Sequence, residues 1–274
     1  MNRNGDNVMR RHGFSAPDWR PWVFPIALIG LWQFISRSGL GHTSLIPTPW
    51  VVFQTAIKLV SKPTFPMAIG ASLLRDLAGF TAGSIAGLAF GSLLGASVLA
   101  QRLFSPAFHV LRQIALFAWI PLISIWIGYT NTARVFVVSL SVFYPVALAT
   151  FDGVRGVALN HVEVGKVLGF GRLQQLARVI LPAASPAILS GLNLALIYAW
   201  IATIGAEFLL PIYNSAGLGD TINQGRGAFR VDIVIFGMLV IGLIGWILNL
   251  AVRKLEKWTP AQAPGFGSGG SNHD

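Results

Sequence analysis

Long apolar runs separated by short polar segments dominate this sequence. A membrane-spanning helix needs about 20 mostly apolar residues, and six runs approach or reach that length. They cover residues 21–35, 77–100, 107–127, 133–151, 187–210 and 233–252. The pattern therefore predicts an all-α membrane protein with six transmembrane helices.

The first run is the shortest, and with basic residues before it a secretory signal is the alternative interpretation. Small residues should then mark a cleavage site after the apolar core. Bulky Trp32 and Phe34 stand there instead, which favours an uncleaved span.

Composition agrees with a membrane location. Hydrophobic residues make up 54% of the chain and charged residues only 11%, whereas a soluble domain has about 25% charged residues. The formal net charge of +10 does not indicate nucleic acid, because the basic residues fall mostly between apolar runs. Cysteine is absent, which excludes disulfides, thiolate metal sites and a cysteine nucleophile.

The distribution of basic residues predicts the orientation, since cytoplasmic loops are enriched in lysine and arginine. With the N-terminus inside, the cytoplasmic segments hold twelve: Arg3, Arg10, Arg11, Arg20, Arg102, Arg155, Lys166, Arg172, Arg178, Arg253, Lys254 and Lys257. The opposite side holds seven: Arg37, Lys58, Lys62, Arg75, Arg134, Arg226 and Arg230. We therefore expect both termini in the cytoplasm of a multi-pass protein.

The chain divides into a cytoplasmic N-terminal segment, 1–20, a six-helix membrane domain, 21–258, and a tail, 259–274. The tail is rich in glycine, proline and serine, so we expect it to be disordered. Outside the membrane, residues 48–74 are expected to form an interfacial helix that begins near Pro49 and is broken near Pro63 and Pro66.

Glycine recurs at every fourth position of the second run, and so forms one stripe along a helix. These residues are Gly79, Gly83, Gly87, Gly91 and Gly95. Without side chains, they allow a neighbouring helix to approach closely. The stripe predicts packing inside the bundle, with a subunit–subunit seam or a pore-lining groove as the alternative.

The segment 153–186 is polar and lies on the predicted cytoplasmic side. Asn160 and Glu163 have the spacing of a helix-capping pair, and Gly169 interrupts the short helix that would follow. A second short helix is expected from about residue 172 to 179, and we expect Pro182 and Pro186 to end it before the fifth span. Two short helices joined by a glycine elbow make a compact projection suited to docking on a soluble partner.

This projection resembles the EAA loop of binding-protein-dependent importer permeases. The matching residues are Glu163, Gly169 six residues later and, after nine further residues, Val179-Ile180-Leu181-Pro182. The two alanines of the family pattern are replaced by Val164 and Gly165, so packing of the first short helix is expected to differ.

Other stretches resemble the sulfonate, taurine and nitrate branch of type I permeases of ATP-binding-cassette (ABC) importers. They are Leu45-Ile46-Pro47-Thr48-Pro49, Ala118-Trp119-Ile120-Pro121-Leu122, Ile125-Trp126-Ile127-Gly128, Gly205-Ala206-Glu207, Gly217-Leu218-Gly219 and Leu255-Glu256-Lys257-Trp258. The family often has a proline pair before the second stretch. Here residues 112–117 contain no proline, so a straighter third helix is expected.

The resemblance implies a subunit of an importer in the bacterial inner membrane. Its partners would be a second permease copy, most simply an identical one, two cytoplasmic ATPases that use ATP and Mg²⁺, and an extracytoplasmic substrate-binding protein. The residues expected at the ATPase contact are Glu163, Gly169, Gly171, Arg172, Leu173, Leu181 and Pro182. The cargo implied is a small solute, most simply an anion such as a sulfonate, taurine or nitrate.

Motifs for catalysis are missing from the sequence. It has no Gly-x-x-x-x-Gly-Lys-Ser/Thr loop, no His-Glu-x-x-His helix and no Gly-x-Ser-x-Gly elbow. We therefore expect no catalytic residue, metal or bound cofactor in this chain. An ion-gradient-driven secondary transporter is the alternative, but it would call for paired intramembrane carboxylates and inverted repeats.

Four residues in or near the spans have polar groups whose role is open. Because charges in a membrane are costly, Glu207 is expected either to pair with a cation or to line the pathway. Tyr198 and Trp200 precede it on the same run. Arg112 either extends its charge to the membrane surface or attracts an anion.

Overall fold

The computed structural model describes residues 20–38, 46–158, 160, 163, 165 and 167–258, and every regular element among them is a helix. Residues 1–19 and 259–274, predicted as a cytoplasmic segment and a disordered tail, lie outside the described residues, as do residues 161, 162, 164 and 166 of the short helix predicted before Gly169.

Three long helices form the centre of the molecule: α3 (Thr64–Ala96), α6 (Asn131–Arg155) and α9 (Leu181–Leu209). Helix α6 packs against both of the others. Small and β-branched residues fill the α6–α9 contact, namely Val138, Val142, Val146, Ala195, Ala199 and Ala202, all fully buried. Such side chains let helices approach closely, which suits packing where water provides no driving force.

The glycine stripe of α3 lies against α6. A Cβ atom added at any of Gly79, Gly83, Gly87, Gly91 or Gly95 would overlap an atom of that helix. The stripe therefore serves a contact within this chain's own bundle.

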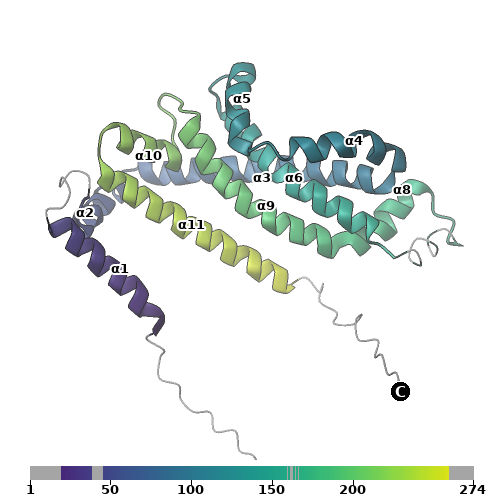
Figure 1. Cartoon of the computed structure of the whole chain (residues 1–274), viewed down its shortest axis with the longest axis horizontal. Helices are drawn as coiled ribbons and strands as arrows, with labels where there is room; N and C mark the ends of the chain where they lie inside the picture. Colours follow the sequence, from purple (N-terminus) through teal and green to yellow (C-terminus); the bar gives the residue numbers. More distant parts are fainter. Residues whose placement is uncertain are drawn as a thin grey trace, which may run out of the picture.

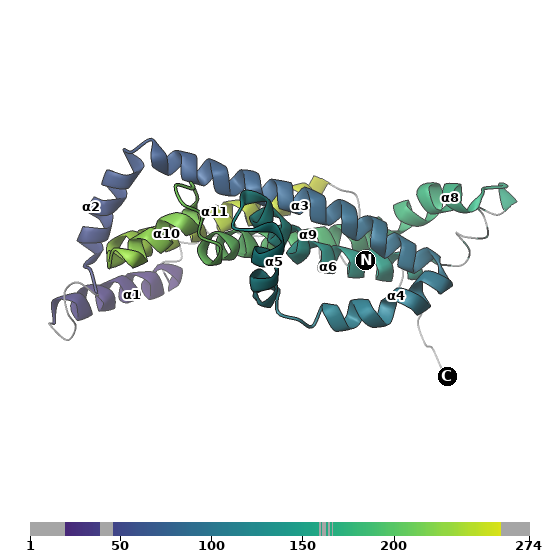
Figure 2. The same cartoon turned by 90° about the horizontal axis from the view of Figure 1, so that it is seen from above.

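The remaining elements leave two distinct ends (Figures 1 and 2). At one end lie α2 (Pro49–Val60), α10 (Leu218–Gly227) and the start of α11 (Val231–Trp258); we call this the α10 end. At the opposite end lies the short helix α8 (Arg172–Gln175), and we call this the α8 end. Helix α1 (Arg20–Arg37) lies beside the main bundle.

The interfacial helix expected over residues 48–74 is partly wrong. Helix α2 begins at Pro49, after Thr48, whose hydroxyl accepts from the Val51 N–H (3.4 Å), but it ends at Val60. Residues 64–74 belong to α3 instead. Pro63 is the N-cap of α3 and Pro66 lies in its first turn, where backbone N–H groups have no helical partner. The break expected near Pro63 is present between α2 and α3, whereas Pro66 lies inside α3 and breaks no helix.

The expectation of a straight third span is wrong. After α3 ends at Ala96, α4 (Val98–Leu111) is followed by the 3₁₀ turn η1 (Leu116–Trp119) and α5 (Ile120–Ile127), and the two parts are bent by 95°. The Phe117 ring lies at Gly205 of α9, where a Cβ would overlap it. Residues 112–117 contain no proline. The bend is accompanied instead by the contact of the Phe117 ring with α9.

The expected stop at Pro182 and Pro186 is also wrong. Helix α8 passes through a π-helical turn, η2 (Leu176–Ile180), directly into α9, so that Arg172–Leu209 is one run of 38 residues. Leu181 N–H donates to the carbonyl of Leu176, five residues earlier. This wider turn lies directly before Pro182, where it makes room for a ring that lacks an N–H. The projection is thus continuous with a central helix.

By length and apolar composition, four helical runs of the described residues are suited to crossing a membrane. They are α3, α6, Arg172–Leu209 and the Val231–Ala251 part of α11. The bent α4–α5 pair makes a fifth if it is one span, and α1 is a shorter apolar helix.

Candidate functional site

The projection at the α8 end is built around Gly169, whose φ of +73° is the left-handed conformation that only glycine adopts at little cost. A Cβ added there would meet nothing within 4 Å, so the backbone angle and not space calls for glycine. The Phe170 N–H donates to the Gly165 carbonyl (3.0 Å), which closes the turn. The conformation expected of Gly169 from sequence is the one observed.

Apolar side chains at this projection face outward rather than into a core. Val167 is 87% exposed, Leu168 63% and Leu173 78%. The neighbouring Glu163 and Arg172 are also exposed. Such a cluster at the tip of a projection indicates a docking surface.

The first short helix departs from the family pattern at Gly165, which is buried. A Cβ at Gly165 would lie 3.4 Å from Val179 Cγ2 and 3.5 Å from Gln175 Cγ, which are ordinary contact distances. The alanine of the family pattern would therefore fit here. Leu181 and Pro182, expected beside the tip, lie instead along the continuous helix.

A buried polar cluster occupies the α10 end, and Glu207 lies at its centre. Its side chain is fully buried and pairs with Arg75 Nη1 at 2.6 Å. The carboxylate also accepts from Ser72 Oγ (2.7 Å) and from the Gly219 N–H (2.9 Å). Glu207 was expected either to pair with a cation or to line the pathway, and the structure shows it paired with a cation, Arg75.

A second buried pair joins Arg134 of α6 to Asp220 of α10, at 2.6 Å and 2.8 Å. Arg134 also donates to the Leu210 carbonyl at the end of α9 (2.7 Å). The Ser215 hydroxyl accepts from both Arg134 and Arg75, so the two pairs form one network. The network ties α3, α6, α9 and α10 together.

A further contact lies one turn along the same helices, where Thr203 Oγ1 donates to Asp76 Oδ1 at 3.0 Å. Thr203 stands out in the sequence as a polar residue one turn before Glu207. The other members of the cluster, Ser72, Arg75, Asp76, Arg134, Ser215 and Asp220, were not identified from sequence as partners of Glu207. Their partners are distant along the chain, up to 146 residues in the case of Ser72 and Leu218. Arg134 lies within an apolar run, and an isolated charge in such a run is the feature of the sequence that could have predicted a buried ion pair.

The other polar candidates do not join this cluster. Trp200 is buried and its Nε1–H donates to the Ile241 carbonyl (3.2 Å), which ties α9 to α11. Tyr198 is 45% exposed. Arg112 is exposed at the C-cap of α4. Within the described part of the chain, no group of three or more His, Asp or Glu side chains is placed to hold a metal ion.

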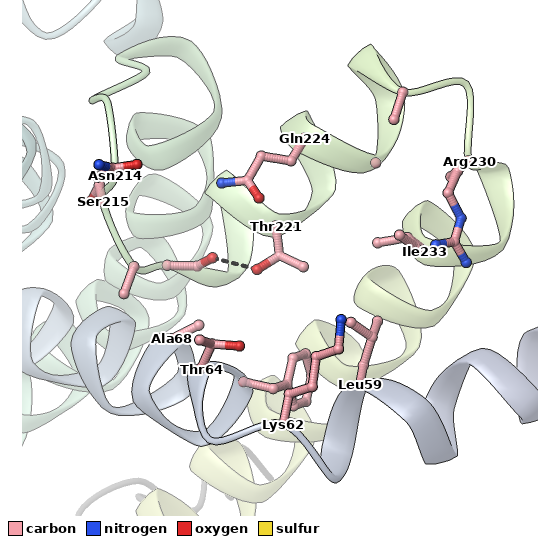
Figure 3. A pocket seen from close by; sticks show the side chains of 15 residues that line it. Leu59, Lys62, Thr64, Ala68, Asn214, Ser215, Thr221, Gln224, Arg230 and Ile233 are labelled. Atoms are coloured by element: carbon pink, nitrogen blue, oxygen red, sulfur yellow. Dashed lines mark hydrogen bonds between the residues drawn. The ribbon is translucent and has the colours of Figure 1, made fainter.

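Beside the polar cluster, a cavity of about 640 Å³ opens between the α2–α3 corner, α10 and the start of α11. Figure 3 shows Lys62 and Gln224 on opposite sides of it, with Arg230 at one end and Asn214 at the other.

Comparisons with known proteins identify the family of this chain. The family described as "Binding-protein-dependent transport system inner membrane component" matches residues 79–259. The aliphatic sulfonates transport permease protein SsuC of Bacillus subtilis is 31% identical over 255 residues, 93% of this chain and 91% of that protein. The nitrate import permease protein NrtB of Synechocystis is 28% identical over 252 residues, 89% of this chain and 90% of that protein.

Among solved structures, an inward-facing conformation of the MetNI methionine ABC transporter matches with a TM-score of 0.58 at 17% identity. The match covers 71% of this chain and 95% of that one, which shows a shared fold. Nothing in these matches supports the ion-gradient alternative. The chain therefore belongs to the binding-protein-dependent transport system inner membrane components, as the permease subunit of an ABC importer whose ATP hydrolysis resides in a separate subunit.

Proposed function

We propose that two copies of this chain, together with two cytoplasmic ATPases and an external substrate-binding protein, import a small oxyanion across the bacterial inner membrane. The support for the cargo comes from relatives named for aliphatic sulfonates and for nitrate. Both anions present three oxygen atoms around one centre. ATP and Mg²⁺ act on the partner subunits, and this chain binds no cofactor.

Six spans are proposed, with α1 as the first. Its 18 residues extend about 27 Å at 1.5 Å per residue, close to the hydrocarbon thickness of about 30 Å. Large apolar side chains along it, such as Phe24, Ile29 and Phe34, are exposed and suited to lipid. With the four long runs and the α4–α5 pair, α1 completes six crossings.

Six crossings put both termini on one side, and the basic residues favour the cytoplasm for that side. Of the seven basic residues on the other side, Arg75 and Arg134 are ion-paired within the bundle. Only five of the seven then remain as loop charges, since 7 − 2 = 5, which strengthens the bias. The projection at the α8 end accordingly faces the cytoplasm.

The observation that carries the mechanism is the continuous helix from the projection to the polar cluster. Arg172 at the tip and Glu207 in the cluster lie on the same run of 38 residues, which changes direction where α8 meets α9 (Figure 1). Movement of the tips when the ATPases close would therefore reach α3, α6 and α10 through the bonds of Glu207 and its neighbours. This is a rigid lever that switches access to the pathway.

The test compares Gly169→Val with the matched control Gly171→Val. Both positions have open space around a Cβ, but Gly171 has an ordinary φ of −65°. Valine at 169 forces a left-handed backbone at a cost of about 1–2 kcal/mol, whereas valine at 171 adds the same bulk without strain. We expect both variants to insert in near-normal amounts. Gly169→Val should lose ATPase co-purification or uptake, and Gly171→Val should lose less, because it adds bulk at the expected contact without backbone strain.

Membrane abundance, ATPase co-purification and uptake are measured side by side. Normal uptake by Gly169→Val would show that the turn at Gly169 does not take part in the contact with the ATPase. Equal losses in both variants would mean that tip size and not backbone angle matters, and failed insertion would mean that the projection serves folding.

A further inference from the structure

The lining of the cavity at the α10 end includes one cation, Lys62, that no carboxylate of the described residues balances. Arg230 is the second cation of the lining, which includes no carboxylate. Three of the buried acids at this end are ion-paired: Glu207 with Arg75, Asp220 with Arg134 and Asp232 with Arg230. Asp76, next to Arg75 on α3, accepts a hydrogen bond from Thr203. Lys62 is exposed and has no carboxylate of the described residues within ion-pairing distance.

Neutral hydrogen-bond donors complete the lining. Asn214 and Gln224 contribute amides and Thr64 contributes a hydroxyl, whereas the Thr221 hydroxyl donates its hydrogen to a backbone carbonyl. Figure 3 shows the Thr221 hydroxyl bonded to a neighbouring backbone carbonyl, that of Gly217 (2.9 Å), and the Gln224 amide at the cavity. Polar donors in a hollow of this size are typical of small-ligand sites.

The helix ends around the cavity also favour negative charge. Thr64 is the first residue of α3 and Ile233 is in the first turn of α11, so two helix N-termini with positive partial charge lie at its edge. The opposite contribution, from the C-terminus of α10, is reduced because its carbonyls are bonded. Arg230 N–H donates to Gly225 O (2.8 Å) and Phe229 N–H donates to Arg226 O (3.1 Å).

The C-terminus of α10 contains a strained backbone conformation. Phe229 adopts a φ of +55°, a conformation that glycine normally supplies at this position. The turn places Arg230 at the cavity, with its side chain 53% exposed and with Nη2 and Nε donating to the Asp232 carboxylate at 2.6 Å and 3.4 Å. Asp232 also accepts a hydrogen bond from Thr55 Oγ1 (2.6 Å). Because a guanidinium has five N–H groups, Arg230 keeps N–H groups that do not bond to Asp232.

We infer that this cavity, bounded by Lys62, Arg230, Asn214 and Gln224, is a receiving site for a small oxyanion at the α10 end of the permease. The inference rests on the proposed function for the identity of the anion as cargo. Lys62 provides a point charge, and the planar Arg230 donates to two oxygens of one anion. Because both cations remain partly solvated, binding is weak and reversible, as transfer onward requires.

The chain contains no cysteine, so one reporter thiol can be introduced. The reporter is Ala228→Cys, at the cavity lining, in the full-length chain bound to its ATPase in lipid nanodiscs. Its rate of reaction with neutral N-ethylmaleimide is measured with increasing methanesulfonate, at ionic strength matched with gluconate. We expect methanesulfonate to slow labelling several-fold in a saturable way, because an anion in the cavity shields the thiol.

Two variants locate the effect. Lys62→Gln with Arg230→Gln should abolish the protection. The matched control Arg226→Gln should keep it, because Arg226 is exposed on α10 but stacks on the Phe208 ring (4.9 Å) instead of lining the cavity. Equal protection by gluconate, or equal loss in Arg226→Gln, would show general charge screening and overturn the inference.

Uptake by the complete transporter separates this inference from the proposed function. Absent protection with normal methanesulfonate uptake would overturn the receiving site and leave the function intact. Protection without uptake of methanesulfonate or nitrate would support an anion site and overturn the proposed cargo.

Discussion

At the scale of the residue, the buried ion pairs of the α10 end have the strongest energetic consequences. Glu207 is fully buried, and its partner Arg75 is only 11% exposed. Charges removed from water are tolerated when each one is paired and hydrogen-bonded. Glu207 meets both conditions through Arg75, Ser72 and the Gly219 N–H. Loss of one member leaves the other as an unpaired buried charge.

Glu207→Gln is therefore expected to destabilise the permease by about 3 kcal/mol, since breaking a buried pair costs roughly 3–5 kcal/mol. The measurement is the melting temperature of the purified protein in detergent, with Arg226→Gln as the control for loss of an exposed charge at the same end. The control should melt close to wild type. If Glu207→Gln melted like the control, the pair would not contribute to stability.

At the scale of the element, the α3–α6 contact depends on absent side chains. A Cβ at Gly83 would overlap the backbone oxygen of Ser139 as well as Val142, and a backbone atom cannot rotate away. The two helices would have to separate along their length. Gly70 lies on the same helix, but a Cβ there would meet nothing within 4 Å.

Gly83→Ala is expected to lower stability by about 1–3 kcal/mol, the usual cost of overpacking. Gly70→Ala is the matched control and should be neutral or stabilising by up to about 1 kcal/mol, because alanine favours the helix. Melting temperature and membrane abundance are compared for the two variants. Equal behaviour would show that α3 and α6 are less closely packed than described.

At the scale of the whole molecule, the six proposed crossings and the basic bias predict that both termini lie in the cytoplasm. A reporter fused to the C-terminus should therefore behave as cytoplasmic, and a fusion within the α10–α11 turn as extracytoplasmic. A periplasmic signal from the C-terminal fusion would reverse the orientation and separate the projection from its proposed ATPase partner.

Local features were predictable from sequence because residues close together along the chain determine them. Apolar runs close to the length that crosses a membrane predicted the main helices. Glycine at every fourth position predicted a close helix contact. The elbow at Gly169 followed from glycine's access to positive φ. Family resemblance at the projection was carried by equally local spacing.

Tertiary structure alone decided the bend after Leu111, the continuation of the helix through Pro182 and the partners of Glu207. The first involves the Phe117 ring at Gly205, and the second a π turn before the proline. The third brings Arg75 and Glu207 together across 132 residues of chain. Hydrophobic period and backbone angle depend on a few successive residues, whereas the partner of a buried charge depends on which helices the fold places side by side.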